Sequence, residues 1–251
     1  MKVFVASAMP TAYPWKLQKP ATVTPKVRDT AEQFILDSGI GDNVSTGELL
    51  QLAERHEPEY IVAKDELYDH TTSTENTLDL LDGLTSCKAS STPLLPLQPP
   101  YDEHYDLLSD HGLDDRMYVL GGMATEDVDT DTQLRWIRNF RRVAPDVYAH
   151  GLGVGGGIEF VTRVAGSGLL DSVDCSTPEL AAMNGAVIDD RLRQTPTMSF
   201  PGGKGRNRRT YPLAEFNSWQ IHDVWARESD PTHVRGDDDQ SGLEAFADAD
   251  E

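Results

Sequence analysis

The feature that most constrains the fold is a repeated alternation of short apolar segments with longer segments of helical periodicity. Short apolar runs bounded by polar or turn residues are typical of strands. The expected strands cover Lys2–Ser7, Phe34–Asp37, Tyr60–Lys64, Pro93–Leu97, Met117–Leu120, Val147–His150, Leu170–Asp174 and Thr197–Phe200. The expected helices cover Thr46–His56, Thr74–Leu84, Asp131–Val143, Ile158–Ala165, Pro178–Met183 and Pro212–Arg227. This order predicts a parallel (β/α)8 TIM-type barrel, with a doubly wound open sheet as the alternative.

The chain length of 251 residues leaves room for one such barrel and little else, because a (β/α)8 barrel takes about 250 residues. We therefore expect a single barrel domain over residues 1–228. The end of the chain differs in composition, since residues 228–251 hold nine acidic residues and one arginine. A segment with so little apolar surface cannot form a packed core, so we expect residues 229–251 to be a disordered acidic tail.

The charge balance is strongly acidic, with 42 Asp and Glu against 22 Lys and Arg and a net charge of −20. Acidic, lysine-poor surfaces are typical of proteins that work in multimolar salt, so we expect a halophilic cellular or viral origin. Salt at that level reduces the Debye length to about 3 Å, so the net charge does not exclude a nucleic-acid partner. A local basic stretch between residues 191 and 211 contains no acid and carries Arg191, Arg193, Lys204, Arg206, Arg208 and Arg209.

Several classes of site and location are not expected. The two cysteines, Cys87 and Cys175, are too few for a disulfide framework or a cysteine-rich zinc site. The seven histidines show no metal-ligand spacing, so we expect no metal and no cofactor. The chain has no apolar run of about 18 residues and no signal-peptide pattern, so we expect a cytoplasmic protein without membrane contact.

Polar groups and glycines follow the expected strands where each strand ends. Carboxylates occur at Asp37, Asp65 and Asp174, and a pair of glycines occurs at Gly121 and Gly122. In a parallel barrel the carboxyl ends of the strands meet on one face, and that face holds the active site. Adjacent glycines let backbone amides approach a flat ligand closely. The pattern predicts a site for a purine-like base flanked by acid chemistry.

Taken in order along the chain, these segments resemble the tRNA-guanine transglycosylase superfamily. Asp37-Ser38-Gly39 resembles the segment whose aspartate is the general acid/base in that family. Asp65-Glu66 resembles the pair that holds the guanine edge. Gln98, which closes an apolar strand, stands where the family has a base-reading glutamine.

The resemblance continues through the second half of the chain. Gly121-Gly122-Met123-Ala124 resembles the Gly-Gly-Leu-Ala segment that lines the base pocket, and Leu152-Gly153-Val154-Gly155 resembles a Met-Gly-Val-Gly turn. Asp174-Cys175 resembles the pair whose aspartate is the nucleophile, and Asn184-Gly185 resembles the residues that follow it. The resemblance thus extends over most of the chain.

Three departures refine this resemblance. The family's zinc-binding Cys-x-Cys-x2-Cys…His element is absent, because no cysteine follows Cys175. Ile40 replaces a second glycine, and Ser176-Thr177-Pro178 replaces the usual Pro-Thr-Arg. A short chain without the zinc element is most similar to the DpdA branch, whose members insert 7-deazaguanine bases into DNA and are often encoded by phages and archaeal viruses.

The resemblance implies a role for each matching residue. Asp174 would be the nucleophile and Asp37 the general acid/base. The expected base-binding residues are Asp65, Gln98, Gly121, Gly122, Met123, Ala124, Ser38 and Gly153. DNA and a free 7-deazaguanine base would be the substrates, with the basic stretch on the phosphate backbone, and a homodimer is a possible assembly.

Other interpretations of the same residues stay open. The base exchange could act on tRNA, or the barrel could bind nucleic acid without catalysis. An unrelated barrel could instead bind a phosphorylated metabolite through Gly155–Gly157, at the start of an expected helix. As structural alternatives, Asp37 could cap a turn, Asp65-Glu66 could be a solvated pair, and Gly121-Gly122 could be a simple turn.

Overall fold

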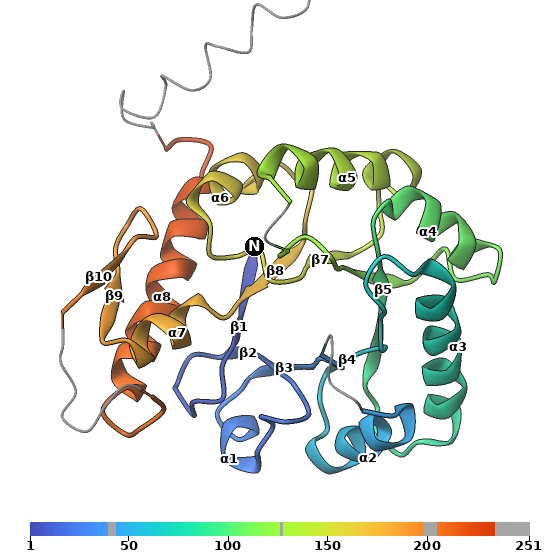
Figure 1. Ribbon diagram of the computed structural model, residues 1–251, viewed down its shortest axis with the longest axis horizontal. Coiled ribbons are helices and arrows are strands. Elements are labelled where there is room, and N and C mark those ends of the chain that lie inside the picture. The colour runs from blue at the N-terminus through green and yellow to red at the C-terminus, as the bar shows by residue number, and fades with distance from the viewer. Residues whose placement is uncertain (40–43, 126–127, 198–204, 234–251) are drawn as a thin grey trace, which may run out of the picture.

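The protein is a closed barrel of eight parallel strands surrounded by helices (Figure 1). The computed structural model describes residues 1–39, 44–125, 128–197 and 205–233. Neighbouring strands pair in chain order, and β8 closes on β1 with Val3 opposite Val173. The strands are β1 Lys2–Ala6, β2 Trp15–Gln18, β3 Gln33–Leu36, β4 Tyr60–Val62, β5 Thr92–Leu97, β6 Met117–Leu120, β7 Ala149–Gly151 and β8 Ser172–Cys175. The prediction of a single (β/α)8 barrel is confirmed.

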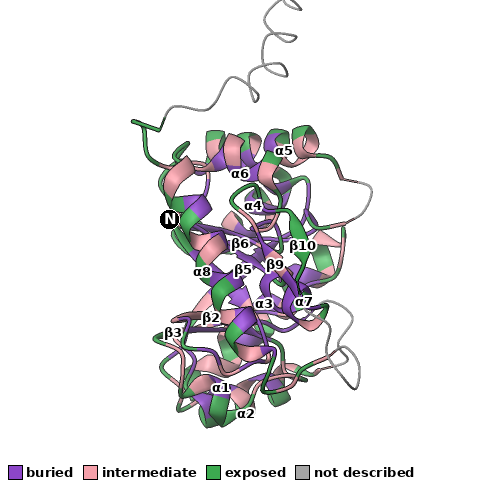
Figure 2. Cartoon of the chain, turned by 90° about the vertical axis from the view of Figure 1, so that its left-hand side faces the viewer, coloured by how far each residue is buried: buried purple, intermediate pink, exposed green. Residues whose placement is uncertain are grey.

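The helices surround the barrel with their buried sides turned toward it (Figure 2). They are α1 Pro25–Arg28, α2 Thr46–His56, α3 His70–Ser86, α4 Tyr101–Ser109, α5 Thr130–Val143, α6 Ile158–Val164, α7 Thr177–Met183 and α8 Tyr211–Glu228. The sequence did not predict α1, which is a single turn, or α4, whose buried side chains Tyr101, Tyr105 and Leu108 do follow a helical spacing. None of the described helices is long and apolar enough to cross a membrane.

The eighth strand was assigned to the wrong segment. Thr197 is not in a strand, and residues 198–200 lie outside the described residues. The missing barrel strand is β2, which carries the polar residues Lys16 and Gln18. Both are buried, and the Lys16 ammonium donates to the Thr11 carbonyl at 2.6 Å and to the Thr30 hydroxyl. A buried strand with polar side chains gives no apolar run in the sequence, so this strand was missed.

A small hairpin lies outside the barrel beside α7 and α8 (Figure 1). It consists of β9 Ala186–Ile188 and β10 Gln194–Pro196, which pair antiparallel. The long helix α8 fixes this side of the molecule, because the buried Trp225 donates its indole N–H to the Gly155 carbonyl at 2.9 Å. Residues 234–251, most of the expected acidic tail, lie outside the described part of the chain.

The barrel interior is apolar on most of its strands and polar on two. Each of β1 to β6 contributes one buried side chain to a single apolar cluster: Phe4, Leu17, Ile35, Val62, Leu94 and Val119. In contrast, β7 contributes His150, and β8 contributes Ser172 and Asp174, all of them buried. The polar side of the interior therefore leads directly to the carboxyl ends of β7 and β8.

Candidate active site

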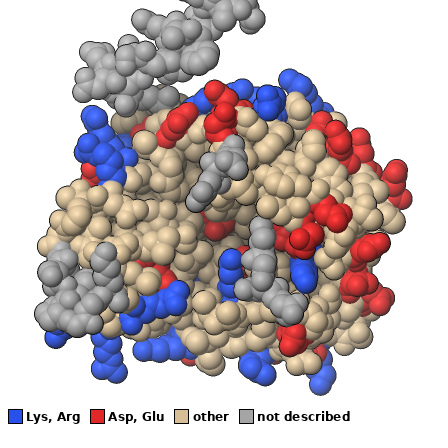
Figure 3. Space-filling model, viewed as in Figure 1, with Lys and Arg blue, Asp and Glu red and all other residues tan. Residues whose placement is uncertain are grey.

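One cavity, of about 330 Å³, opens at the carboxyl ends of the barrel strands. Figure 3 shows a hollow near the middle of this face, with acidic atoms inside it. The lining residues come from the ends of most of the strands: Ala6, Leu17, Lys19, Asp37, Asp65, Leu67, Gly121, Gly122, Ala124, Thr125, Leu152, Gly153, Asp174 and Ser176. The structure thus brings together the three carboxylates that the sequence placed at strand ends.

Asp37 and Asp65 are buried carboxyl groups that hold protons more tightly than usual. Burial, and then the charge of Asp174, raises the pKa of Asp37 to about 6, against the pull of the Gly39 N–H. Burial, and then the charge of Asp37, raises the pKa of Asp65 to about 6. A carboxyl group with a pKa near neutrality can both donate and accept a proton, as a general acid/base must.

Asp174 is held by two donors on one of its oxygens. Its Oδ1 accepts from the Gly153 N–H at 2.9 Å and lies 3.2 Å from His150 Nε2. Within the described ranges, no protein donor is hydrogen-bonded to its Oδ2. The carboxylate therefore presents one fixed oxygen and one free oxygen at the cavity.

Gln98 lies behind the cavity rather than in its wall. Its side-chain amide donates to Asp65 Oδ2 at 2.5 Å, and its Oε1 accepts from the Tyr68 N–H at 3.4 Å. A Cβ on Gly121 would come within 2.5 Å of Gln98 Nε2. The absence of a side chain on Gly121 therefore permits this close approach. The sequence predicted that Gln98 binds the base, but in the structure Gln98 hydrogen-bonds to Asp65 and does not line the cavity.

Gly121 also differs from the expectation that its amide reads the base. Its N–H donates to the Leu97 carbonyl at 2.9 Å, and its carbonyl accepts from the Tyr101 hydroxyl at 2.5 Å. Gly122 lines the cavity with a φ of +72°, and a Cβ there would lie 2.9 Å from Pro99 Cδ. Only Gly122 of this pair is placed to offer its amide to a ligand.

Two further residues expected at the base turn out to be structural. The Ser38 hydroxyl donates to the Ala63 carbonyl at 3.1 Å, and Met123 is fully buried, so neither lines the cavity. Ala124 and Gly153 do line it, as expected. A Cβ on Gly153 would lie 2.8 Å from the Ala124 Cβ, so these two small residues pack against each other at the cavity wall.

Lys19 and His150 are site residues that sequence reasoning missed. Lys19 directly follows β2, lines the cavity, and tends to lower the pKa of Asp37 and of Asp65. It was overlooked because β2 itself was not recognised. His150 was overlooked because a single histidine carries no spacing signal.

The basic stretch is divided by its ion pairs. Arg206 pairs with Glu179 at 2.5 Å, and Arg193 pairs with Asp189 at 2.7 Å. Arg191, Arg208 and Arg209 are exposed and make no ion pair with any described residue. Lys204 lies outside the described residues. Three arginines of this stretch therefore remain open to an external anion.

The glycine run Gly155–Gly157 is explained in part by packing. The Gly155 N–H donates to the Asp174 carbonyl at 2.9 Å, and its own carbonyl accepts from Trp225. A Cβ on Gly156 would lie 2.2 Å from the Thr177 hydroxyl oxygen. These contacts account for two of the glycines without a bound phosphate.

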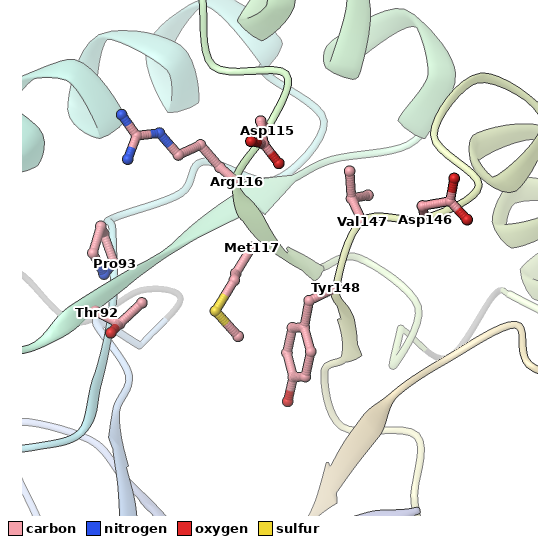
Figure 4. A pocket seen from close by; sticks show the side chains of 8 residues that line it. All are labelled: Thr92, Pro93, Asp115, Arg116, Met117, Asp146, Val147 and Tyr148. Atoms are coloured by element: carbon pink, nitrogen blue, oxygen red, sulfur yellow. The ribbon is translucent and has the colours of Figure 1, made fainter.

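A second pocket, of about 300 Å³, lies at the amino ends of β5 and β6, opposite the carboxylates (Figure 4). Its lining residues are Thr92, Pro93, Asp115, Arg116, Met117, Asp146, Val147 and Tyr148. In TIM barrels this end serves stability rather than chemistry. Among the residues with described positions, no group of three or more His, Cys, Asp or Glu side chains could hold a metal ion.

Comparison with known proteins establishes the fold alone. No protein-family model matches this chain, and no curated protein matches it. Among solved structures, the YdjI aldolase from Escherichia coli K12 is similar, with a TM-score of 0.59 and 11% sequence identity. The similarity covers 93% of this chain and 93% of the aldolase. At this identity it supports a shared TIM-barrel architecture and does not extend to activity.

The raised pKa of Asp37 predicts a pH-dependent cost to stability. The folded value of about 6 exceeds the usual 3.8, so the stability contributed by the tighter proton binding is complete below about pH 4 and is lost as the pH rises through 6. Asp37→Asn stays neutral at every pH. We expect it to be more stable than the wild type at pH 7, by about 2 to 3 kcal/mol, and to show no such gain at about pH 4.

Urea unfolding across this pH range measures the difference between the two proteins. Asp79→Asn, which changes an exposed helix residue, is the matched control and should give no pH-dependent difference. A gain for Asp37→Asn that does not grow between pH 4 and pH 7 would contradict the raised pKa.

Proposed function

We propose that this protein is a base-exchange transglycosylase that replaces guanine in DNA with a 7-deazaguanine base. The observation that carries the proposal is the pair of unlike carboxyl groups at one cavity. Both line the cavity and both are buried, but Asp174 has two donors on one oxygen, whereas Asp37 has a pKa of about 6. One group is thus suited to attack and the other to move a proton, the division of labour that two-carboxylate glycosyl chemistry requires.

The first half of the exchange breaks the glycosidic bond. A carboxylate oxygen of Asp174 attacks C1′ of the deoxyribose, the bond from C1′ to N9 breaks, and its electron pair leaves with the guanine. Asp37, protonated, gives its proton to the departing base. The product is a covalent ester between Asp174 and the sugar, which divides one difficult displacement into two easier ones.

The second half reverses these steps with a different base. The Asp37 carboxylate takes the N9 proton of the incoming 7-deazaguanine, N9 attacks C1′, and Asp174 leaves as a carboxylate. Asp37 ends the cycle protonated, as it began. A pKa near 6 supports this double role, because the group is readily loaded and unloaded with a proton near neutral pH.

Asp65 is the group placed to select the base. Its carboxylate can accept hydrogen bonds from the N1–H and the 2-amino group of a guanine-like edge. Adenine has neither an N1–H nor a 2-amino group, so its binding would leave the buried carboxylate without these hydrogen-bond donors. Leu17, Leu67 and Leu152 supply apolar surface in the same cavity for the faces of the ring.

The nucleic acid must deliver its base into this cavity from outside the helical stack. Lys19 at the cavity rim carries the positive charge nearest the carboxylates and suits a phosphate or sugar oxygen of the target nucleotide. Arg191, Arg208 and Arg209 are exposed for backbone contacts. The same cavity would serve a guanine in tRNA, so the test of the proposal includes both nucleic acids.

Replacement of the nucleophile should abolish the covalent intermediate. We expect the wild type, incubated with DNA and free base, to form an adduct that survives denaturing electrophoresis and to incorporate labelled guanine. Asp174→Asn should do neither, yet bind DNA with unchanged affinity, because the substitution removes one charge inside the cavity and leaves the arginines on the phosphate backbone in place. Asp146→Asn at the opposite end of the barrel is the control and should behave as wild type.

Parallel reactions with DNA and with tRNA identify the substrate. Incorporation into tRNA alone would move the activity to RNA while keeping the mechanism. If Asp174→Asn still exchanges bases, Asp174 is not the nucleophile. If the wild type binds DNA or tRNA but exchanges no base in either, the protein is a non-catalytic nucleic-acid-binding barrel.

The unpaired arginines should carry the salt dependence of binding. Arg208→Ala combined with Arg209→Ala should weaken DNA binding and reduce the slope of log affinity against log salt by about 2, close to one for each phosphate that the protein no longer neutralises. Arg193→Ala is the matched control, because Arg193 is already paired with Asp189, and it should change the slope less. If the slope of log affinity against log salt is the same in the double variant as in the wild type, Arg208 and Arg209 do not contact the DNA backbone.

A further inference from the structure

We infer that His150 is a positioning residue that holds Asp174 with its Oδ2 toward the sugar, and that Ser172 holds the His150 ring in the orientation that this requires. The role in the reaction rests on the proposed transglycosylase function. The arrangement itself rests on a chain of contacts inside the barrel.

Two adjacent strands build this chain of contacts. His150 on β7 stands opposite Ser172 on β8, and side chains two residues apart point to the same side of a strand. Asp174 therefore follows Ser172 into the barrel interior, and Tyr148, just before β7, lies on the same side as His150. The contacts are 2.5 Å from Tyr148 Oη to Ser172 Oγ, 2.7 Å from Ser172 Oγ to His150 Nδ1, and 3.2 Å from His150 Nε2 to Asp174 Oδ1.

The direction of each hydrogen bond follows from the chemistry of the two ends. A carboxylate only accepts, so the Nε2 of His150 carries the proton toward Asp174. Burial raises the pKa of Tyr148 to about 12, so its hydroxyl stays protonated and can donate to Ser172. The Ser172 hydroxyl then donates to Nδ1, which is the acceptor of a neutral ring. In this arrangement the Tyr148 hydroxyl, the Ser172 hydroxyl and the His150 Nε2–H each donate one hydrogen bond to the next group.

The surroundings of His150 favour a ring that is held in place. The side chain is fully buried, and its ring packs edge-on against Phe4 with centroids 5.7 Å apart. A ring fixed on both nitrogens and against an aromatic neighbour cannot turn away from Asp174. Removal of the Ser172 hydroxyl would take away the donor to Nδ1 and leave the ring held only by its hydrogen bond to Asp174 and by its packing against Phe4.

The consequence for the reaction is a choice between the two oxygens of Asp174. Oδ1 accepts from both the Gly153 N–H and His150, which fixes the plane of the carboxylate. Oδ2 is left for the bond to C1′. When Asp174 leaves in the second half of the exchange, the same two donors stabilise the charge that returns to Oδ1. His150 transfers no proton in either half.

The chain of contacts ends at the opposite face of the barrel. Tyr148 lines the second pocket, at the amino ends of the strands (Figure 4), so it can be altered far from the nucleic acid. The network should show graded effects. Loss of His150 removes its hydrogen bond to Asp174, loss of the Ser172 hydroxyl loosens the His150 ring, and loss of the Tyr148 hydroxyl removes only the group behind Ser172.

A matched pair of substitutions separates positioning from packing. A glutamine at position 150 can place its amide nitrogen near the position of Nε2, whereas an asparagine reaches only the position of Nδ1. We expect His150→Asn and His150→Phe to form the covalent adduct about 100-fold more slowly in single-turnover experiments. His150→Gln should recover much of that rate, Ser172→Ala should fall between the wild type and His150→Asn, and Tyr148→Phe should lose little. DNA affinity should be unchanged in all of them.

The tautomer can be measured without any reaction. The ¹⁵N chemical shifts of the His150 ring should report a protonated Nε2 and an unprotonated Nδ1 in the wild type, and the Nδ1 shift should change in Ser172→Ala, where its hydrogen bond is lost. A protonated Nδ1 in the wild type, or equal adduct rates for His150→Gln and His150→Asn, would overturn the inference. If the wild type forms no adduct with DNA or tRNA, the proposed function fails, and the ring shifts still decide the arrangement around Asp174.

Discussion

The site depends on the burial of three carboxyl groups at one cavity, where their charges also repel one another. Burial, and then the charge of Asp174, makes Asp37 harder to ionise, and burial, followed by the charge of Asp37, does the same to Asp65. The three groups differ in the hydrogen bonds that they accept. Asp174 has two donors on one oxygen, Asp65 has the amide of Gln98, and Asp37 accepts from the Gly39 amide at 3.3 Å. Differences of this kind assign acid and nucleophile roles to chemically identical groups.

The barrel makes this arrangement possible because its strands are not equivalent. β1 to β6 fill the interior with one apolar layer, which anchors the carboxyl ends of these strands in fixed positions. β7 and β8 instead carry polar side chains that hydrogen-bond to one another through the interior. Asp174, at the end of this row of polar side chains, therefore lies on a rigid strand. Strands hold functional side chains in position more accurately than loops do.

Much of this could be predicted from the sequence because it depends on local pattern. The order of apolar segments predicted the barrel, and the strand-end positions of Asp37, Asp65 and Asp174 brought them to one cavity. β2 was missed because Lys16 and Gln18 are polar although both are buried, and Lys16 is held there by the Thr11 carbonyl and the Thr30 hydroxyl. A pattern of hydrophobicity cannot reveal a strand whose buried side chains are polar.

The use of each hydrogen bond could not be predicted in the same way. The Gly121 amide belongs to the ladder with β5, and the Gln98 amide belongs to Asp65, because the closure of the barrel sets those neighbours. The role of His150 arises only from the register of β7 against β8. Arg206 is bound by Glu179, 27 residues before it. Local sequence identifies the residue types at the site, and tertiary pairing decides which of them reach the ligand.

The most direct test of the proposed base exchange is nucleoside mass spectrometry of DNA and tRNA from cells that express this protein and are supplied with 7-deazaguanine precursors. We expect a 7-deazaguanine deoxynucleoside in DNA from cells with the active protein and none in DNA from cells without it. DNA and tRNA that both contain only ordinary guanine, while the precursor is present in the cells, would contradict this expectation.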